Sequence, residues 1–249
     1  MFTIHPQAES FLLSGTEETA ILFIHGFSAS PSEVYPVARI IHELTGITVS
    51  GPLLPGHGCS PQAMNTTCWQ DWWGRIEQEV DYLQRHYARV FVAGLSMGGL
   101  LALYTAGRSR DLEGVIAINT PIFTNSPGLI TLAPLLQYVR PYHPKKFDPA
   151  ALEMEAQGRY AYPVMPVKAL VSMQRLRRLV VQELPNLDVP ILLFQSRTDL
   201  LVDPRSAEYI REKADRALIK LIELDNSGHI ATMGGEQLLI AEEIIDFMS

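Results

Sequence analysis

A chain of 249 residues, of which 47% are apolar and 19% charged, has the composition of an ordinary globular protein with a substantial core. Its formal net charge of −7 argues against general affinity for nucleic acid or anionic membranes, because both favour a basic face. We expect neither a signal peptide nor a membrane span, because no basic region precedes an apolar stretch at the N-terminus and no apolar run is long enough. Cys59 and Cys68 form no metal or redox motif, which predicts a cytoplasmic protein with free thiols.

Short apolar runs alternate with amphipathic segments through the first half of the chain. The apolar run at residues 20–24 is typical of a strand covered on both faces, and Pro31 suits the first turn of a helix. This alternation predicts an α/β fold with a mostly parallel central sheet flanked by helices. The expected strands are residues 20–24, 47–50, 90–93 and 114–119, and the expected helices are residues 31–44, 69–86 and the segment after Ser96.

The alternation stops at Thr120-Pro121 and resumes near Val189. The stretch between is too long for an ordinary loop, and its clearest pattern is helical, at residues 172–183. We therefore predict a small helical cap at residues 121–187, inserted into a core domain made of residues 1–120 and 188–249. In the second part of the core we expect strands at 189–195 and 219–224 and helices at 204–213 and 235–248.

The motif Gly94-Leu95-Ser96-Met97-Gly98 lies between a predicted strand and a predicted helix. G-x-S-x-G in this context is typical of a nucleophile elbow, where the serine occupies a strained turn and the glycines leave room for close packing. Ser96 is therefore the candidate nucleophile.

A serine nucleophile needs a general base and a carboxylate to orient that base. His229 and Asp199 follow the two last predicted strands, in the chain order Ser, acid, His of this kind of fold. Asp203 is the alternative acid, but its place before Pro204 favours a helix cap. His25 and His57 lie in loops and are interpreted as structural.

Hydrolysis of an ester also requires N–H donors for the oxyanion. The residue after the nucleophile supplies one donor, the backbone N–H of Met97, and the loop after the first buried strand supplies the other. In that loop, His25-Gly26-Phe27, we expect the Phe27 N–H to be the second donor.

Taken together, these motifs resemble the bacterial carboxylesterase and monoacylglycerol lipase group of α/β-hydrolases. The resemblance covers nearly the whole chain and implies an α/β-hydrolase fold, a triad of Ser96, Asp199 and His229, donors at Phe27 and Met97, and neither a cofactor nor a metal. The residues that carry it are His25-Gly26-Phe27, Leu54-Pro55-Gly56-His57-Gly58, the elbow with Gly99, Asp199 with Val202 and Pro204, Gly228-His229, and the cap segment 160–169.

The expected activity is that of a serine carboxylesterase acting on small-molecule esters with short to medium acyl chains, as a monomer or homodimer. A monoacylglycerol lipase is the alternative enzyme, and a non-catalytic ligand receptor on the same fold is the alternative of another class. Apolar residues of the cap are expected to line the acyl site as a group, although for each single residue core packing of the cap helices is the favoured explanation. These residues are Ile122, Leu129, Leu136, Val139, Val171 and Met173.

Overall fold

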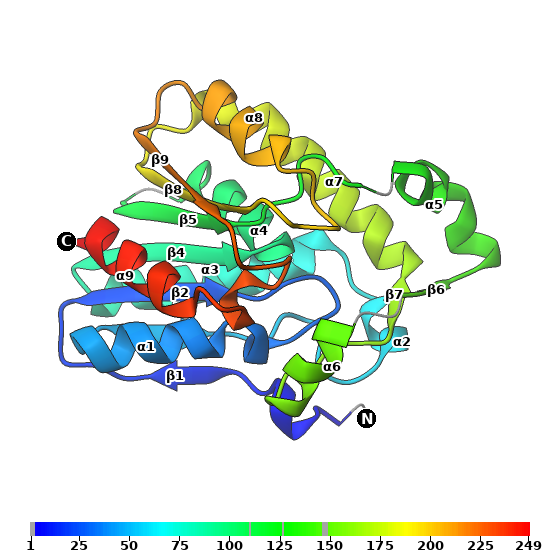
Figure 1. Cartoon of the computed structure of the whole chain (residues 1–249), viewed down its shortest axis with the longest axis horizontal. Coiled ribbons are helices and arrows are strands. Elements are labelled where there is room, and N and C mark those ends of the chain that lie inside the picture. Colours follow the sequence, from blue (N-terminus) through cyan, green and yellow to red (C-terminus); the bar gives the residue numbers. More distant parts are fainter. Residues whose placement is uncertain (1–2, 110, 126, 146–148) are drawn as a thin grey trace.

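A seven-stranded sheet forms the centre of the molecule in the computed structural model, which describes residues 3–109, 111–125, 127–145 and 149–249 (Figure 1). Its strand order is β1-β3-β2-β4-β5-β8-β9. Neighbouring strands are parallel except β1 and β3, which pair antiparallel at one edge. The strands are β1 (Phe11–Leu13), β2 (Thr19–Ile24), β3 (Thr48–Gly51), β4 (Arg89–Leu95), β5 (Gly114–Ile118), β8 (Ile191–Ser196) and β9 (Ile219–Leu224).

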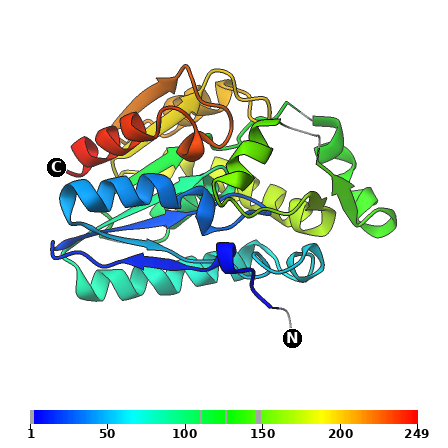
Figure 2. The same cartoon turned by 60° about the horizontal axis from the view of Figure 1, so that its bottom comes forward.

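Helices cover both faces of this sheet, and Figure 2 shows α1 and α3 on opposite sides of it. Along β2, Leu22 joins an apolar cluster with α3, α4 and α8, while Phe23 joins a second cluster with α1 and α9. Because successive side chains of a strand point to opposite faces, a strand covered on both faces must be apolar throughout. The helices are α1 (Tyr35–Thr45), α2 (Pro61–Met64), α3 (Trp69–His86), α4 (Met97–Ala106), α8 (Arg205–Lys213) and α9 (Gln237–Met248).

The prediction of a mostly parallel sheet flanked by helices is confirmed. The edge strand β1 was not predicted, because three residues are too few to show an alternating pattern. Short 3-10 helices complete the core at Pro6–Ala8, Pro31–Glu33, Leu184–Asn186 and Ala231–Met233. No helix in the described ranges combines the length and apolar character needed to cross a membrane.

The segment predicted to be a cap, residues 121–187, is mainly helical where the structure describes it; residues 126 and 146–148 lie outside the described part. Figure 1 shows α5 and α6 beyond the end of the sheet at which β4 terminates. Helix α7 packs against α4, α3 and α5 and so ties the segment to the core. The elements are α5 (Pro127–Val139), β6 (Tyr142–Pro144), α6 (Pro149–Ala156), β7 (Val164–Pro166) and α7 (Val167–Glu183). The exact cap boundaries stay a prediction.

Candidate active site

Ser96 occupies a strained turn between β4 and α4. Its backbone has φ 56° and ψ −115°, a conformation that side-chain-bearing residues rarely adopt. A Cβ atom on Gly94 would lie 2.1 Å from the carbonyl carbon of Gly98, and one on Gly98 would lie 2.2 Å from the Ile24 oxygen. Only glycine at both positions therefore lets the helix start so close to β2 and β4, which explains the two glycines of the motif.

His229 brings its imidazole to this serine. Its Nε2 atom lies 3.0 Å from Ser96 Oγ, and its Nδ1 atom lies 2.7 Å from Asp199 Oδ2. Because an ionised carboxylate only accepts hydrogen bonds, Nδ1 carries the proton and donates it to Asp199. The lone pair of Nε2 is then free to accept the hydroxyl hydrogen of Ser96.

Asp199 is fully buried, and backbone donors surround its second oxygen. The N–H groups of Leu201 and Val202 donate to Oδ1 at 2.8 and 2.9 Å. These charge-assisted bonds offset the loss of water around the carboxylate and fix its plane. The acid is thereby held with Oδ2 turned toward His229.

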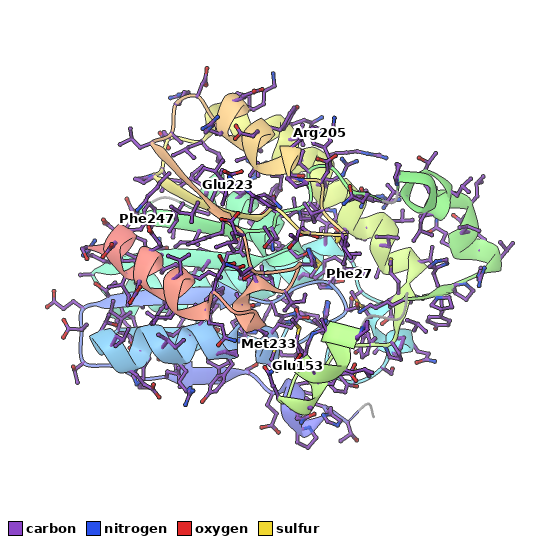
Figure 3. All side chains as sticks on the ribbon, viewed as in Figure 1. Phe27, Glu153, Arg205, Glu223, Met233 and Phe247 are labelled. Carbon is purple, nitrogen blue, oxygen red and sulfur yellow. The ribbon has the colours of Figure 1, made fainter. Side chains whose placement is uncertain are left out.

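Asp203, the alternative acid, has a different role. Its carboxylate accepts the backbone N–H of Arg205 at 3.0 Å and also the guanidinium of that residue. The Arg205 side chain is the main cause of the lowered pKa of Asp203. The structure therefore places the Asp203 carboxylate against the first N–H of α8, but the N-cap position of the helix is Pro204, one residue later than predicted. Figure 3 shows Arg205 at one end of that helix.

Asn119 joins the loops of the acid and the histidine, and sequence reasoning missed it. From the end of β5, its Nδ2 donates to the carbonyl oxygens of Gly228 and His229 at 3.2 and 2.8 Å. Its Oδ1 accepts the N–H of Ser196, at the end of β8, at 2.7 Å. Asn119 also has a positive φ of 46°. A polar residue at the carboxyl end of a buried parallel strand was the available signal.

The two expected oxyanion donors border Ser96. Met97 begins α4, where the first N–H groups of a helix have no partner within it. A Cβ atom on Gly26, next to Phe27, would lie 3.7 Å from Ser96 Cβ. Across the described residues, neither N–H has a hydrogen-bond partner, so both are available to a ligand. Figure 3 shows Phe27 on the side of the molecule where α6 and β7 lie.

His25 fixes the peptide group that carries the Phe27 N–H. Its Nε2 accepts the N–H of Leu54 at 3.2 Å, so its Nδ1 is protonated and donates to the Gly26 oxygen at 2.9 Å. Burial lowers the pKa of His25 to about 4, which keeps the ring neutral. The ring of His57 lies 4.9 Å away, edge-on, and burial lowers its pKa as well. Both histidines are buried, as expected of structural residues.

The six residues expected to line an acyl site are not equally placed. Ile122 and Met173 are buried in the apolar cluster that includes α4. Leu129, Leu136 and Val171 pack half-buried against that cluster. Val139 is outside the cluster and 80% exposed, because it ends α5 on the face turned to solvent. The packing thus separates Val139 from the other five.

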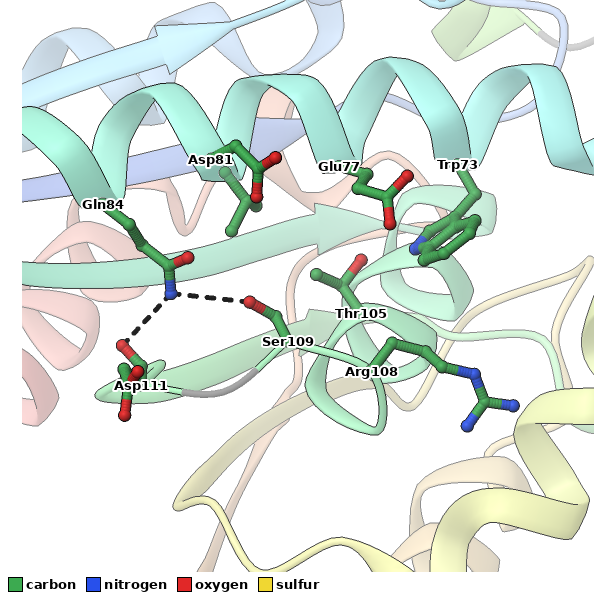
Figure 4. A pocket seen from close by; sticks show the side chains of 9 residues that line it. Trp73, Glu77, Asp81, Gln84, Thr105, Arg108, Ser109 and Asp111 are labelled. Atoms are coloured by element: carbon green, nitrogen blue, oxygen red, sulfur yellow. Dashed lines mark hydrogen bonds between the residues drawn. The ribbon is translucent and has the colours of Figure 1, made fainter.

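A polar cavity of about 280 Å³ lies elsewhere, between α3 and the end of α4 (Figure 4). Glu77, Asp81 and Arg108 line it, and Gln84 donates across it to Ser109 and to the Asp111 carbonyl. None of Ser96, Asp199 and His229 borders this cavity. In the part of the chain that the structure describes, no group of three or more His, Cys, Asp or Glu is arranged to hold a metal ion.

Comparisons with known proteins give related enzymes. A model of the alpha/beta hydrolase family matches residues 21–239. The chain is 29% identical over 247 residues to a thermostable monoacylglycerol lipase of Bacillus sp. (strain H-257), with 96% of each chain covered. It is 26% identical over 232 residues to a carboxylesterase of Bacillus subtilis (strain 168), covering 93% of this chain and 92% of the relative. A solved structure from a study of the metagenome-derived lipolytic enzymes LipS and LipT superposes with a TM-score of 0.89 at 29% identity, over 99% of both chains.

Proposed function

Because the chain belongs to the alpha/beta hydrolase family and is a hydrolase of the esterase or lipase kind, we propose that it is a serine carboxylesterase with Ser96 as nucleophile. The observation that carries this proposal is the continuous chain of hydrogen bonds from Ser96 Oγ through His229 to the buried Asp199. A hydroxyl becomes a useful nucleophile at neutral pH only when a base in that position removes its proton.

In the proposed mechanism, Ser96 Oγ attacks the carbonyl carbon of the ester while His229 Nε2 takes the hydroxyl proton. Asp199 holds the imidazole in place and stabilises the imidazolium that forms. The N–H groups of Phe27 and Met97 stabilise the negative oxygen of the tetrahedral intermediate. His229 then protonates the departing alcohol, which leaves an acyl group on Ser96. Water, deprotonated by the same histidine, attacks the acyl-enzyme and releases the acid.

The proposed substrates are small-molecule esters with short to medium acyl chains. The inserted segment at residues 121–187 would act as a cap, and Ile122 and Met173, which join it to the core cluster, would border the acyl group. Monoacylglycerol hydrolysis is the second candidate activity. The observation that favours it is the relative named as a monoacylglycerol lipase, to which this chain is 29% identical over almost its full length.

The test is hydrolysis of p-nitrophenyl esters from acetate to palmitate, with 1-monoacylglycerols alongside. We expect highest kcat/KM at short or medium chains, and a loss of about 10⁴-fold or more in Ser96→Ala. Ser249→Ala, a change of the same kind at the chain end, is the matched control and should leave the rate unchanged. Predominant monoacylglycerol turnover would move the assignment to the lipase.

A fluorophosphonate probe separates the enzyme from a ligand receptor of the same fold. The probe reacts with an activated serine, so wild-type protein should be labelled and Ser96→Ala should not. Full ester turnover by Ser96→Ala, or absence of both labelling and turnover in folded wild-type protein, would reject the proposed esterase.

A further inference from the structure

A buried ion pair joins the inserted segment to the β2–α1 loop, residues 25–34, which contains Phe27. Arg159, located between α6 and β7, donates from Nε and Nη2 to Glu33 Oε1 at 2.8 and 2.6 Å. The side chains of Arg159 and Glu33 are 10% and 1% exposed. Charges held this far from water interact strongly, because little solvent remains to screen them.

The second oxygen of Glu33 lies close to the proposed reacting groups. Glu33 Oε2 is buried and has no hydrogen-bond partner among the residues that the structure describes. A Cβ atom on Gly26 would lie 3.0 Å from this oxygen and 3.7 Å from Ser96 Cβ. The carboxylate of Glu33 and the side chain of Ser96 therefore both lie within 4 Å of the same point beside Gly26. The next N–H along the chain, that of Phe27, is the proposed oxyanion donor.

Residues next to Arg159 also hold the β2–α1 loop through hydrogen bonds. The N–H of Tyr162 donates to the Ser28 carbonyl at 2.8 Å, and the N–H of Tyr160 donates to Ser32 Oγ at 2.9 Å. Ser28, directly after Phe27, has a positive φ of 58°. The inserted segment thus supports a strained part of the loop. Arg159 directly precedes the residues that form these hydrogen bonds.

The charge balance around Glu33 depends mainly on Arg159. An ionised Glu33 without a partner would repel the oxyanion that forms beside Gly26. Two further titratable groups, His25 and Lys145, are in electrostatic contact with Glu33. Burial keeps His25 neutral at pH 7, with a pKa of about 4, and burial lowers the pKa of Lys145 to about 8. Only Arg159 forms a hydrogen-bonded ion pair with the carboxylate in the described residues.

We propose that Arg159 is a positioning residue for ester hydrolysis: it neutralises Glu33 and so allows negative charge to develop on the substrate oxygen near Phe27. The inference rests on the proposed function. It assigns to the inserted segment a part in the chemical step, besides any part in binding the acyl group.

The main test is kcat and KM of Arg159→Met for a p-nitrophenyl ester between pH 5 and 8. We expect kcat to fall about 10- to 100-fold at pH 8 with little change in KM, since the repulsion arises only when negative charge develops. The ratio of variant to wild-type kcat should recover as the pH is lowered, because protonation removes the charge of a carboxylate that has lost its partner. Taking the ratio removes every effect of pH that the two proteins share.

Variants of the partner separate charge from loop support. Glu33→Gln removes the ion pair and the negative charge together, so its kcat should stay within about threefold of wild type, and Glu33→Gln with Arg159→Met should recover most of the lost kcat. Arg159→Lys keeps the charge and should retain most activity. Arg108→Met is the matched control, because Arg108 pairs with Glu183 away from Ser96 and its loss should leave kcat unchanged.

A pH-independent loss in Arg159→Met, or a loss of tenfold or more in Glu33→Gln, would overturn the inference and leave Arg159 as loop support only. If Arg159→Met does not fold, Glu33→Gln alone decides by the same threshold. A failure of the proposed function would give a different result. In that case wild-type protein hydrolyses no ester, or Ser96→Ala retains the activity, whatever Arg159 variants do.

Discussion

Helices α4 and α5 contain no charged residue, yet they occupy opposite environments. In α4, residues 97–105 are all buried, because the helix lies between the sheet and helices α3 and α7. In α5, Ala133 is the buried residue, while Leu135 and Tyr138 are 72% and 82% exposed. Apolar composition therefore does not decide burial; the elements available to cover a helix do. The helix that begins after Ser96 belongs to the buried core, and α5 belongs to the outer part of the inserted segment.

The largest effect on activity is expected in the core, where the loop after β8 holds the proposed catalytic acid, Asp199. Asp199→Asn should lower kcat about 10⁴-fold, because an amide donor facing Nδ1 favours the tautomer whose Nε2 cannot accept the serine proton. Steady-state kinetics with a p-nitrophenyl ester measures this. Asp203→Asn is the matched control at the start of α8, and its kcat should change less than threefold. Equal losses in both variants would contradict the assignment of the acid.

Matched leucine truncations test the comparison of the two helices directly. Leu100→Ala in α4 removes a side chain that is fully buried and should lower the free energy of unfolding by about 2–5 kcal/mol. Leu135→Ala in α5 removes a 72% exposed side chain and should change it by less than about 0.5 kcal/mol. Urea denaturation followed by far-UV circular dichroism gives both values. A large destabilisation by Leu135→Ala would show that α5 is covered in solution, for example by a second copy of the chain.

A smaller effect is expected in the pH dependence of the free energy of unfolding, from His25 in the core beside the active site. Because burial depresses the pKa of His25 to about 4, the unfolded chain binds a proton between pH 6.5 and 4 that the native protein does not. The free energy of unfolding should therefore fall as the pH decreases through this window, by about 2 kcal/mol between pH 7 and 5 for this group. Urea denaturation at both pH values measures the change.

Two substitutions isolate the part of this change that belongs to His25. His25→Gln should reduce the difference in stability between pH 7 and pH 5, and His86→Gln, at an exposed position on α3, should leave it as in wild type. An unchanged pH dependence in His25→Gln would mean that His25 is protonated in the native state.

Much of the core was predictable because its patterns are local. The apolar runs at β2, β4, β5 and β8 show strands that are covered on both faces. The glycines around Ser96 indicate a turn that no larger residue could form, and the clashes at Gly94 and Gly98 give the physical reason. The interpretation of Asp203 as a helix cap also used only neighbours in the sequence; its carboxylate does accept the first N–H of α8, although Pro204 occupies the N-cap position.

Other features were decided by tertiary contacts alone. Asn119 bonds to residues more than a hundred positions away, and Arg159 reaches Glu33 across 126 positions, so no local pattern could reveal either partner. Leu100 and Leu135 lie in equally apolar segments, and only the position of α4 against the sheet buries one of them. The sequence by itself determined where the covered strands of the core, the turn at Ser96 and the candidate reactive side chains occur, since these depend on neighbouring residues. Which polar groups pair and which apolar faces are covered depended on the folding of distant segments onto one another.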